Sequence, residues 1–158
     1  MTPPRIFEMV SQRNPGIPNE PSPKIEHQPG PRPPAPNTGM GIIIFAHGSR
    51  IESANDGVRR VAADVAKLGS FRHVQAAFLE LGQPSLAGAA AKLAADGVDE
   101  IVVIPYFLTL GLHLERDLPQ IVAEAAAAHA NIKIKVSPPL EGHPALVQIL
   151  LDRWKQAT

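Results

Sequence analysis

The 158-residue chain contains no cysteine, and this absence excludes disulfide bonds, iron–sulfur clusters and zinc sites built on thiolates. Long apolar runs are missing too, since no segment reaches the roughly 18 residues of a membrane-spanning helix. Charge is balanced at 15 basic and 15 acidic residues, and only 4% of residues are aromatic, so no basic nucleic-acid surface is expected. The N-terminus has neither signal-peptide nor transit-peptide character. We therefore expect a cytoplasmic protein with neither nucleic acid nor a membrane as partner.

Proline is abundant but unevenly distributed, because eleven of the 17 prolines lie in residues 1–39. Few large apolar side chains occur there, so the segment cannot bury enough surface to offset the entropy lost on ordering. The sequence predicts a disordered proline-rich tail over residues 1–39 and a single domain over 40–158. Met40 opens the first predicted strand, which leaves a second interpretation: translation starts at Met40, and the tail is an upstream extension.

Strand-like and helix-like segments alternate along the domain. Apolar runs typical of buried parallel strands predict strands at 41–46, 74–80, 101–106 and, as an edge strand with alternating lysines, 132–136. Helical spacing predicts helices at 53–69, 84–97, 117–129 and 143–154, the first two ending at glycines and the third capped by Asp117. The last helix carries an apolar stripe of Leu146, Val147, Leu150, Leu151 and Trp154. This order predicts an α/β fold, a four-stranded parallel sheet with helices on both faces.

Polar side chains follow the ends of three predicted strands. His47 comes directly after the first strand, Glu80 closes the second and His113 follows the third, at successive spacings of 33 residues. One strand-plus-helix unit has about this length, and the carboxyl ends of parallel strands share the functional edge of such a sheet. We therefore expect the three side chains to converge at that edge.

Two imidazoles and a carboxylate suit a divalent ion such as Fe²⁺, Co²⁺, Ni²⁺ or Zn²⁺, and they leave one coordination position open for a substrate. The same imidazoles could instead accept protons, because imidazole changes its charge near neutral pH. Each residue alone also has a structural interpretation: His47 as a turn residue, Glu80 as a solvated strand end and His113 as a helix cap.

The other histidines of the domain occupy positions that favour structural roles. His73 enters the second strand at the opposite edge, and His129 lies near a helix C-terminus, where the helix dipole favours it. His143 shares the functional edge with Glu141, but its place before Pro144 favours a helix N-cap.

Glycines and arginines flank the two site histidines. Gly48 and Gly111 allow the main chain to approach a large ligand closely. Arg50 and Arg116 could pair with anionic groups of such a ligand, or they could be ordinary solvated surface residues.

Four motifs carry a resemblance to a known family. HGSR after the first strand, FLELGQPSL, PYFLTLGLHLERDLP and SPPLEGHPALVQIL resemble segments of the small class II chelatases of the CbiX/SirB type. The resemblance covers residues 40–158 and none of the tail. It implies a chelatase-type domain that inserts a divalent metal into sirohydrochlorin without ATP, with no cofactor beyond the substrate metal, and that pairs as a homodimer.

The resemblance also implies residue roles. His47 matches the family's proton acceptor and metal ligand, His113 its second metal-binding histidine, and Glu80 the carboxylate near the metal, so the two histidines are the expected catalytic residues. Contacts to the tetrapyrrole are expected from Ser49, Arg50, Gln83, Leu108, Thr109, Leu110, Gly111, Leu112 and His113.

Three questions stay open at this point. Co²⁺ for cobalamin biosynthesis is slightly favoured over Fe²⁺ for siroheme biosynthesis, and Ni²⁺ also fits. A zinc hydrolase could use the same His/Glu/His set, although no further carboxylate stands out as a water-activating base. A non-catalytic carrier of metal or tetrapyrrole would need the same site without accelerating metal insertion.

Overall fold

The computed structural model describes residues 39–109 and 111–157, and for Leu112, His113 and Leu114 it describes the backbone alone. The predicted disorder of the tail therefore concerns residues that, except for Gly39, lie outside the described part. Strands and helices alternate as predicted, in the order β1 (Met40–Ala46), α1 (Glu52–Gly69), β2 (His73–Phe78), α2 (Leu86–Ala95), β3 (Glu100–Pro105), α3 (Leu112–Ala127), β4 (Lys133–Val136) and α4 (Pro144–Ala157).

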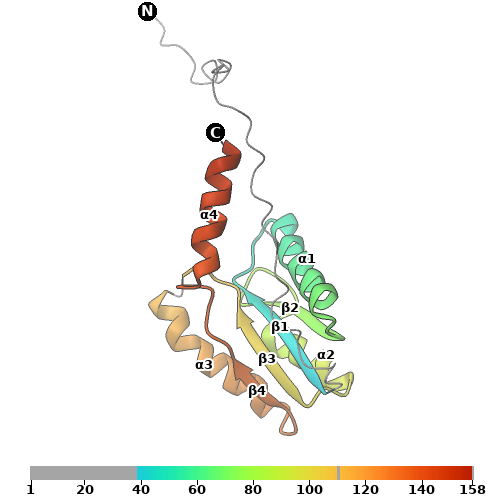
Figure 1. Ribbon diagram of the computed structural model, residues 1–158. Coiled ribbons are helices and arrows are strands. Elements are labelled where there is room, and N and C mark those ends of the chain that lie inside the picture. Colours follow the sequence, from blue (N-terminus) through green and yellow to red (C-terminus); the bar gives the residue numbers. More distant parts are fainter. Residues whose placement is uncertain (1–38, 110, 158) are drawn as a thin grey trace, which may run out of the picture. The chain divides into compact units, whose positions relative to one another are not determined.

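The four strands form one parallel sheet in the order β2-β1-β3-β4 (Figure 1). Strand β1 lies inside the sheet and is buried from Gly41 to Ala46, as its continuous apolar run predicts. Strand β4 lies at an edge, where Lys135 reaches across to Glu100 of β3 with 2.6 Å between Nζ and Oε1. The predicted α/β fold is thus confirmed.

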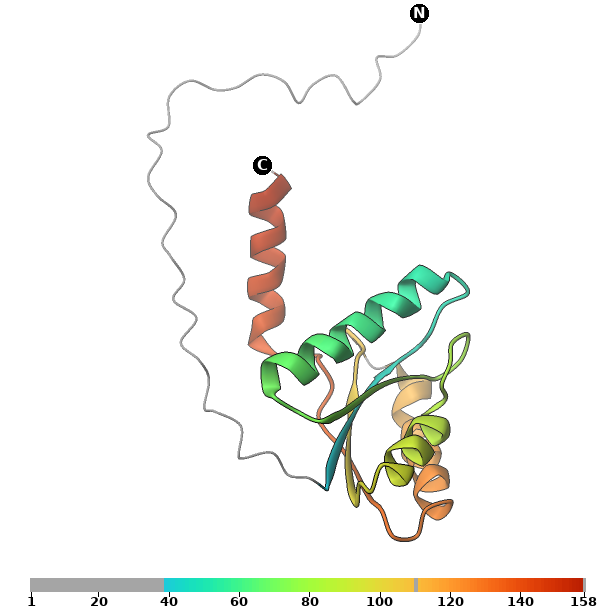
Figure 2. The ribbon, with the colours of Figure 1, turned by 90° about the vertical axis from the view of Figure 1, so that its right-hand side faces the viewer.

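Helices cover both faces of the sheet (Figure 2). Alternate residues of β1 point to opposite faces, as strand geometry requires. Ile42 belongs to a core cluster with Ala62 of α1, whereas Ile43 belongs to a second cluster with Leu93 of α2 and Leu118 of α3. Helix α1 therefore covers one face, and α2 and α3 cover the other.

The ends of the first two helices follow local backbone chemistry. Helix α1 extends through Gly69, the predicted stop, and the left-handed residue is Ser70, with φ 55°. Helix α2 begins after Ser85, whose hydroxyl accepts a hydrogen bond from the backbone N–H of Gly88 at 3.2 Å. Gly97 follows α2 with φ 82°, so the predicted glycine stop of this helix is confirmed.

Helix α3 begins earlier than the sequence predicts. Gly111 is its N-cap, and the helix runs from Leu112 to Ala127. The predicted cap at Asp117 is therefore wrong, because Asp117 lies within the helix, two residues before the internal Pro119. As a result, the connection from β3 is shorter than predicted, and His113 is the second residue of the helix.

Helix α4 presents its apolar stripe to solvent. The Nδ1 of His143 accepts a hydrogen bond from the backbone N–H of Ala145 at 3.2 Å, which confirms the predicted capping role. No residue of α4 is buried, and the side chains of Val147 and Leu150 are 62% and 69% exposed. None of the described helices combines the length and apolar content needed to cross a lipid bilayer.

Candidate active site

His47 and Glu80 lie side by side at the carboxyl edge of the sheet. The imidazole Nε2 is 3.5 Å from the carboxylate Oε1, and the two side chains are 57% and 58% exposed. The imidazole and the carboxylate therefore lie together at a position where a ligand from solvent can contact both.

Strand register brings this pair together. Ala46 at the end of β1 pairs with Phe78 at the end of β2. Beyond the strands, two backbone hydrogen bonds continue the alignment: Leu79 N–H to Ala46 O at 2.9 Å, and Glu80 N–H to His47 O at 3.0 Å. The two side chains therefore leave neighbouring, hydrogen-bonded segments of backbone.

Glycine at position 48 permits this close approach. Gly48 has φ 93°, a left-handed conformation that side chains disfavour. A Cβ atom built at this position would overlap the carbonyl oxygen of Glu80. The loop after β1 can therefore lie against the loop after β2 only because residue 48 has no side chain.

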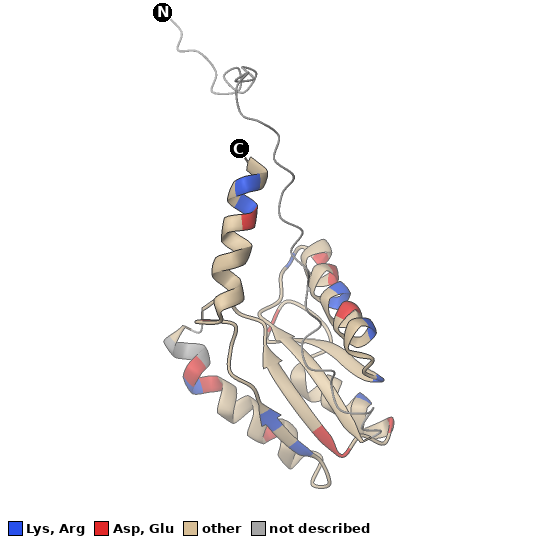
Figure 3. Cartoon of the chain, viewed as in Figure 1, with Lys and Arg blue, Asp and Glu red and all other residues tan. Residues whose placement is uncertain are grey.

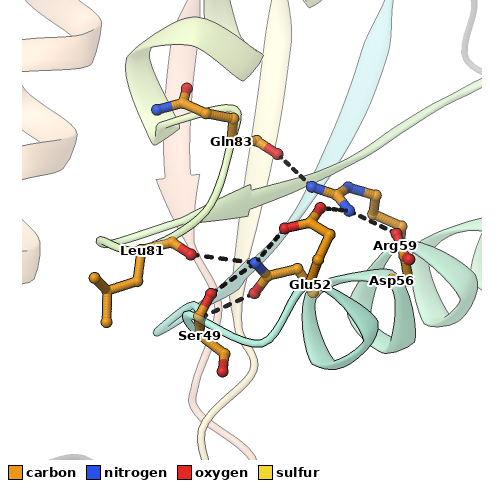
Figure 4. A network of polar contacts seen from close by, with 7 residues as sticks. Ser49, Glu52, Asp56, Arg59, Leu81 and Gln83 are labelled. Atoms are coloured by element: carbon orange, nitrogen blue, oxygen red, sulfur yellow. Dashed lines mark hydrogen bonds and ion pairs between the residues drawn. The ribbon is translucent and has the colours of Figure 1, made fainter.

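Asn55 of α1 connects the same two loops, on which Ser49 and Leu81 are labelled in Figure 4. Its side chain is 1% exposed; the Oδ1 accepts from the backbone N–H of Ser49 at 2.9 Å, and the Nδ2 donates to the Ser49 carbonyl at 2.9 Å. The Nδ2 also lies 3.1 Å from the carbonyl oxygen of Leu81 and 3.1 Å from Oε2 of Glu52. Asn55 is not among the predicted site residues, although its helical spacing with Val58 is a signal, since it places an amide on the core-facing side of α1.

Arg59, one turn further along α1, also contacts the second loop. One guanidinium nitrogen bonds Oε1 of Glu52 at 2.6 Å and Oδ1 of Asp56 at 2.7 Å, while the other donates to the Gln83 carbonyl at 3.0 Å. Hydrogen bonds from Arg59 first, and from Asn55 second, lower the pKa of Glu52. Hydrogen bonds to Glu52 and then Asp56 raise the pKa of Arg59. Acidic and basic residues interleave along this helix (Figure 3), and Arg59 forms ion pairs with both Glu52 and Asp56.

The predicted substrate residues of the first two loops lie near the pair. Ser49 is held through its main chain by Asn55, and its hydroxyl accepts from the backbone N–H of Ile51 at 3.1 Å. Arg50 is exposed, as is Gln83, whose side chain points away from Arg59 (Figure 4). Arg50 and Gln83 are therefore accessible from solvent.

The third predicted segment follows β3. The backbone N–H of Tyr106 bonds the carbonyl of Phe45 at 2.7 Å, so this segment also starts alongside β1. Leu108 is 69% exposed, Thr109 is exposed and Gly111 caps α3. Leu110 and the side chains of Leu112 and His113 lie outside the described part.

His113 therefore decides whether a three-residue ligand set exists. Within the described side chains, no group of three His, Cys, Asp or Glu residues is arranged to hold a metal ion. The convergence of His113 with His47 and Glu80 stays a prediction, which the start of α3 after β3 supports, because β3 neighbours β1.

A cavity of about 250 Å³ lies elsewhere, between α2, α3 and the ends of β1 and β2. Its lining is Phe45, Phe78, Leu79, Ser85, Leu86, Ala87, Ile121, Glu124 and Ala125. Neither His47 nor Glu80 contributes to it, so we place the candidate site at the open edge and not in this cavity.

The fold and the His47–Glu80 pair define a parallel α/β domain with an open polar site at its carboxyl edge. Residues 41–157 match the family model named CbiX. The chain therefore belongs to the CbiX family.

Curated relatives carry chelatase names. A sirohydrochlorin cobaltochelatase of Methanopyrus kandleri is 29% identical over 138 residues, which cover 75% of this chain and 96% of the relative. Another from Sulfurisphaera tokodaii is 34% identical over 116 residues, covering 73% of this chain and 92% of the relative. A chloroplastic sirohydrochlorin ferrochelatase of Arabidopsis thaliana is 32% identical, with 72% of this chain and 50% of the relative covered.

Solved structures share the fold. The crystal structure of a CbiX protein from Marinobacter aquaeolei superposes with a TM-score of 0.67 at 28% identity, covering 75% of this chain and 96% of that one. The sirohydrochlorin chelatase SirB from Bacillus subtilis, in complex with cobalt, superposes with a TM-score of 0.68 at 25% identity, covering 74% of this chain and 50% of that one.

Proposed function

We propose that this chain inserts a divalent metal, Co²⁺ or Fe²⁺, into sirohydrochlorin without ATP. The observation that carries the proposal is the His47–Glu80 pair, 3.5 Å apart at the exposed carboxyl edge of a CbiX-family domain. Relatives named for cobalt and for iron insertion support both metals. Co²⁺ is slightly favoured, and cobalamin biosynthesis is then the pathway served.

His47 acts in this proposal as the proton acceptor. Metal insertion breaks two N–H bonds of the macrocycle, and the incoming dication replaces the two protons on the ring nitrogens. Once the ion has left it for the macrocycle, the neutral imidazole can accept one proton at neutral pH, release it to water and then accept the second. The exposure of His47 allows both the approach of a flat ring and the return of the proton to solvent.

Glu80 holds the metal next to this base. Its carboxylate, together with His47 and the predicted ligand His113, forms a mixed nitrogen and oxygen set that suits Co²⁺, Fe²⁺ and Ni²⁺. Few ligands and an open position let the ion leave for the macrocycle. The metal is a substrate in this scheme, and the expectation that no further cofactor is needed remains a prediction.

The macrocycle is proposed to lie across the three loops. Leu108 offers exposed apolar surface, and Arg50 is free to pair with a carboxylate of sirohydrochlorin. Ser49, Gln83 and the stretch from Thr109 to His113 complete the proposed contact set. The N-terminus of α3 within this stretch also favours anionic groups.

An anaerobic spectrophotometric assay tests the function. The full chain is mixed with sirohydrochlorin and with Co²⁺, Fe²⁺ or Ni²⁺ in turn, and the change of the absorption spectrum reports insertion. We expect acceleration over the protein-free reaction, and a loss of about 100-fold or more in His47→Ala. His73→Ala is the matched control, because His73 lies at the opposite, amino end of β2. Tight binding of sirohydrochlorin without acceleration indicates a carrier instead, and co-purifying zinc with no chelatase activity indicates a hydrolase.

We also propose that the protein acts as a homodimer in the cytoplasm. Exposed apolar side chains on α4, including Val147 and Leu150, support pairing, because apolar surface of this extent favours association with another protein surface. The cytoplasmic location remains a prediction.

A further inference from the structure

Asn55 is the one buried polar residue among the side chains that the structure describes, which leaves out those of residues 112–114. It lies on the core-facing side of α1 with Val58 and Ala62. A buried amide costs free energy unless its hydrogen bonds are satisfied, and no buried side-chain nitrogen or oxygen of the described part lacks a partner. An amide at a core-facing position therefore needs a reason beyond packing.

Its partners supply that reason. Two hydrogen bonds hold both the N–H and the carbonyl of Ser49, at 2.9 Å each, and a third reaches the carbonyl of Leu81 at 3.1 Å. Ser49 is two residues after His47, and Leu81 is the residue after Glu80. Figure 4 labels Ser49 and Leu81 on the two loops that these hydrogen bonds join. The Asn55 side chain is thus hydrogen-bonded to both of the loops that carry His47 and Glu80.

Capping of α1 does not account for this arrangement. The N-cap residue of the helix is Ile51, without a side-chain hydrogen bond, and a cap would satisfy only backbone groups near the helix start. The Leu81 carbonyl is 26 residues away in sequence and belongs to a different loop. This long-range hydrogen bond is the contact that a simple capping role does not require.

We infer that Asn55 is a positioning residue that fixes the separation of His47 and Glu80. Its side chain acts on the pair through the backbone of residues 49 and 81. This inference rests on the proposed function, since the pair it positions is the proposed proton acceptor and metal ligand. Arg59 also connects α1 to the second loop, through a hydrogen bond to the Gln83 carbonyl, but its side chain is partly exposed.

The chemistry is sensitive to this separation. Delivery of an ion and removal of a proton must occur on the same macrocycle, and a misplacement of about 1 Å from a distant change can cost about 100-fold in rate. Loss of the Asn55 amide should therefore lower kcat. The KM for sirohydrochlorin should change little, because Asn55 is buried and does not face the macrocycle.

Two substitutions in the full chain test the inference. Asn55→Ala removes every hydrogen bond of the side chain. Asn55→Asp keeps an acceptor for the Ser49 N–H but cannot donate to the Leu81 carbonyl when ionised, and it places a second carboxylate beside Glu52. Leu93→Ala is the control, because Leu93 is fully buried in the core cluster on the other face of the sheet. It lowers stability without touching either loop.

We expect kcat to fall about 10- to 100-fold in both Asn55 variants, with the KM for sirohydrochlorin within about 2-fold of wild type, at a temperature where all variants are folded. Leu93→Ala should retain wild-type kcat at that temperature. In hydrogen exchange, the amides of Ser49 and Glu80 should lose protection in Asn55→Ala and keep it in Leu93→Ala.

Wild-type kcat in both Asn55 variants would overturn the inference and leave the proposed function intact. An equal loss of kcat in Leu93→Ala would also overturn it, since stability alone would then explain the effect. If the wild-type protein shows no chelatase activity, the proposed function fails, and hydrogen exchange still decides whether Asn55 holds the two loops: unchanged protection in Asn55→Ala refutes that role.

Discussion

The imidazole of His47 and the carboxylate of Glu80 lie 3.5 Å apart although 33 positions separate them in the sequence. They follow the ends of the adjacent strands β1 and β2, and the backbone segments that carry them remain hydrogen-bonded beyond the sheet. The candidate site is therefore built from the two parts of the chain that the sheet itself aligns.

Glu80→Gln should weaken the binding of the metal ion more than the binding of the macrocycle. The substitution keeps size and removes the charge that attracts the dication, so the apparent KM for Co²⁺ should rise at least about 10-fold. Steady-state assays with varied Co²⁺ measure it. Glu100→Gln removes a carboxylate at the amino end of β3 and serves as the control. Equal effects of the two substitutions would contradict a direct role of Glu80.

Gly48→Ala should destabilise the fold and impair the site together. An alanine at φ 93° costs about 1–3 kcal/mol in backbone strain, and its Cβ would press the two loops apart at the Glu80 carbonyl. Urea unfolding followed by circular dichroism gives the loss in free energy of unfolding.

Gly57→Ala provides the opposite control for that measurement. Gly57 lies within α1, and the nearest atom to an added Cβ is the far end of Arg60 at 3.8 Å. We expect Gly57→Ala to increase the free energy of unfolding by about 0.5–1 kcal/mol, because alanine loses less backbone entropy than glycine in a helix. Similar losses in both variants would show that close loop approach is not what Gly48 provides.

Lowering the pH should remove the contribution of the Glu52–Arg59 ion pair to the free energy of unfolding. The pKa of Glu52 is lowered in the folded protein from its ordinary 4.5, chiefly by the hydrogen bond from Arg59. Its contribution to stability is therefore present above about pH 4.5 and is lost as pH falls through the lowered folded-state pKa. Unfolding free energies measured from pH 6 downward should fall less steeply in Glu52→Gln than in wild type. Parallel curves would contradict the prediction.

Leu150→Glu should shift the proposed dimer toward monomer. A carboxylate at a side chain that is 69% exposed on α4 costs little in the isolated chain but cannot be buried cheaply against a second copy. Light scattering after size exclusion measures the mass. Gln156→Glu adds the same charge off the apolar stripe, beside Arg153, and should leave the mass unchanged. A wild-type monomer would end the dimer proposal.

Much of the fold could be predicted because its elements carry strong local patterns. The run from Gly41 to Ala46 is apolar throughout and proved to be the buried strand β1. The start of α3 could not be placed, because Asp117 followed by Leu118 and Pro119 is typical of a helix start, yet the helix takes in the preceding residues and tolerates the internal proline.

The site was only partly predictable for a related reason. Side chains with characteristic chemistry, such as His47 and Glu80, can be recognised from their positions after strands. Asn55 binds mainly backbone atoms of Ser49 and Leu81. Backbone groups are the same in every residue type, so the sequence does not show which residues bind Asn55. Periodicity likewise identified the apolar stripe of α4 but not its exposure. The spacing of apolar residues indicates which of them share a helix face, and it does not indicate whether another element covers that face.

The hydrogen bond between the Glu80 N–H and the His47 carbonyl has a bearing on how this protein can vary. The two segments are hydrogen-bonded residue by residue at this point, so one residue inserted between Phe78 and Glu80 would shift the carboxylate out of register with the imidazole. The geometry of the site therefore constrains the number of residues between the end of β1 and His47, and between the end of β2 and Glu80.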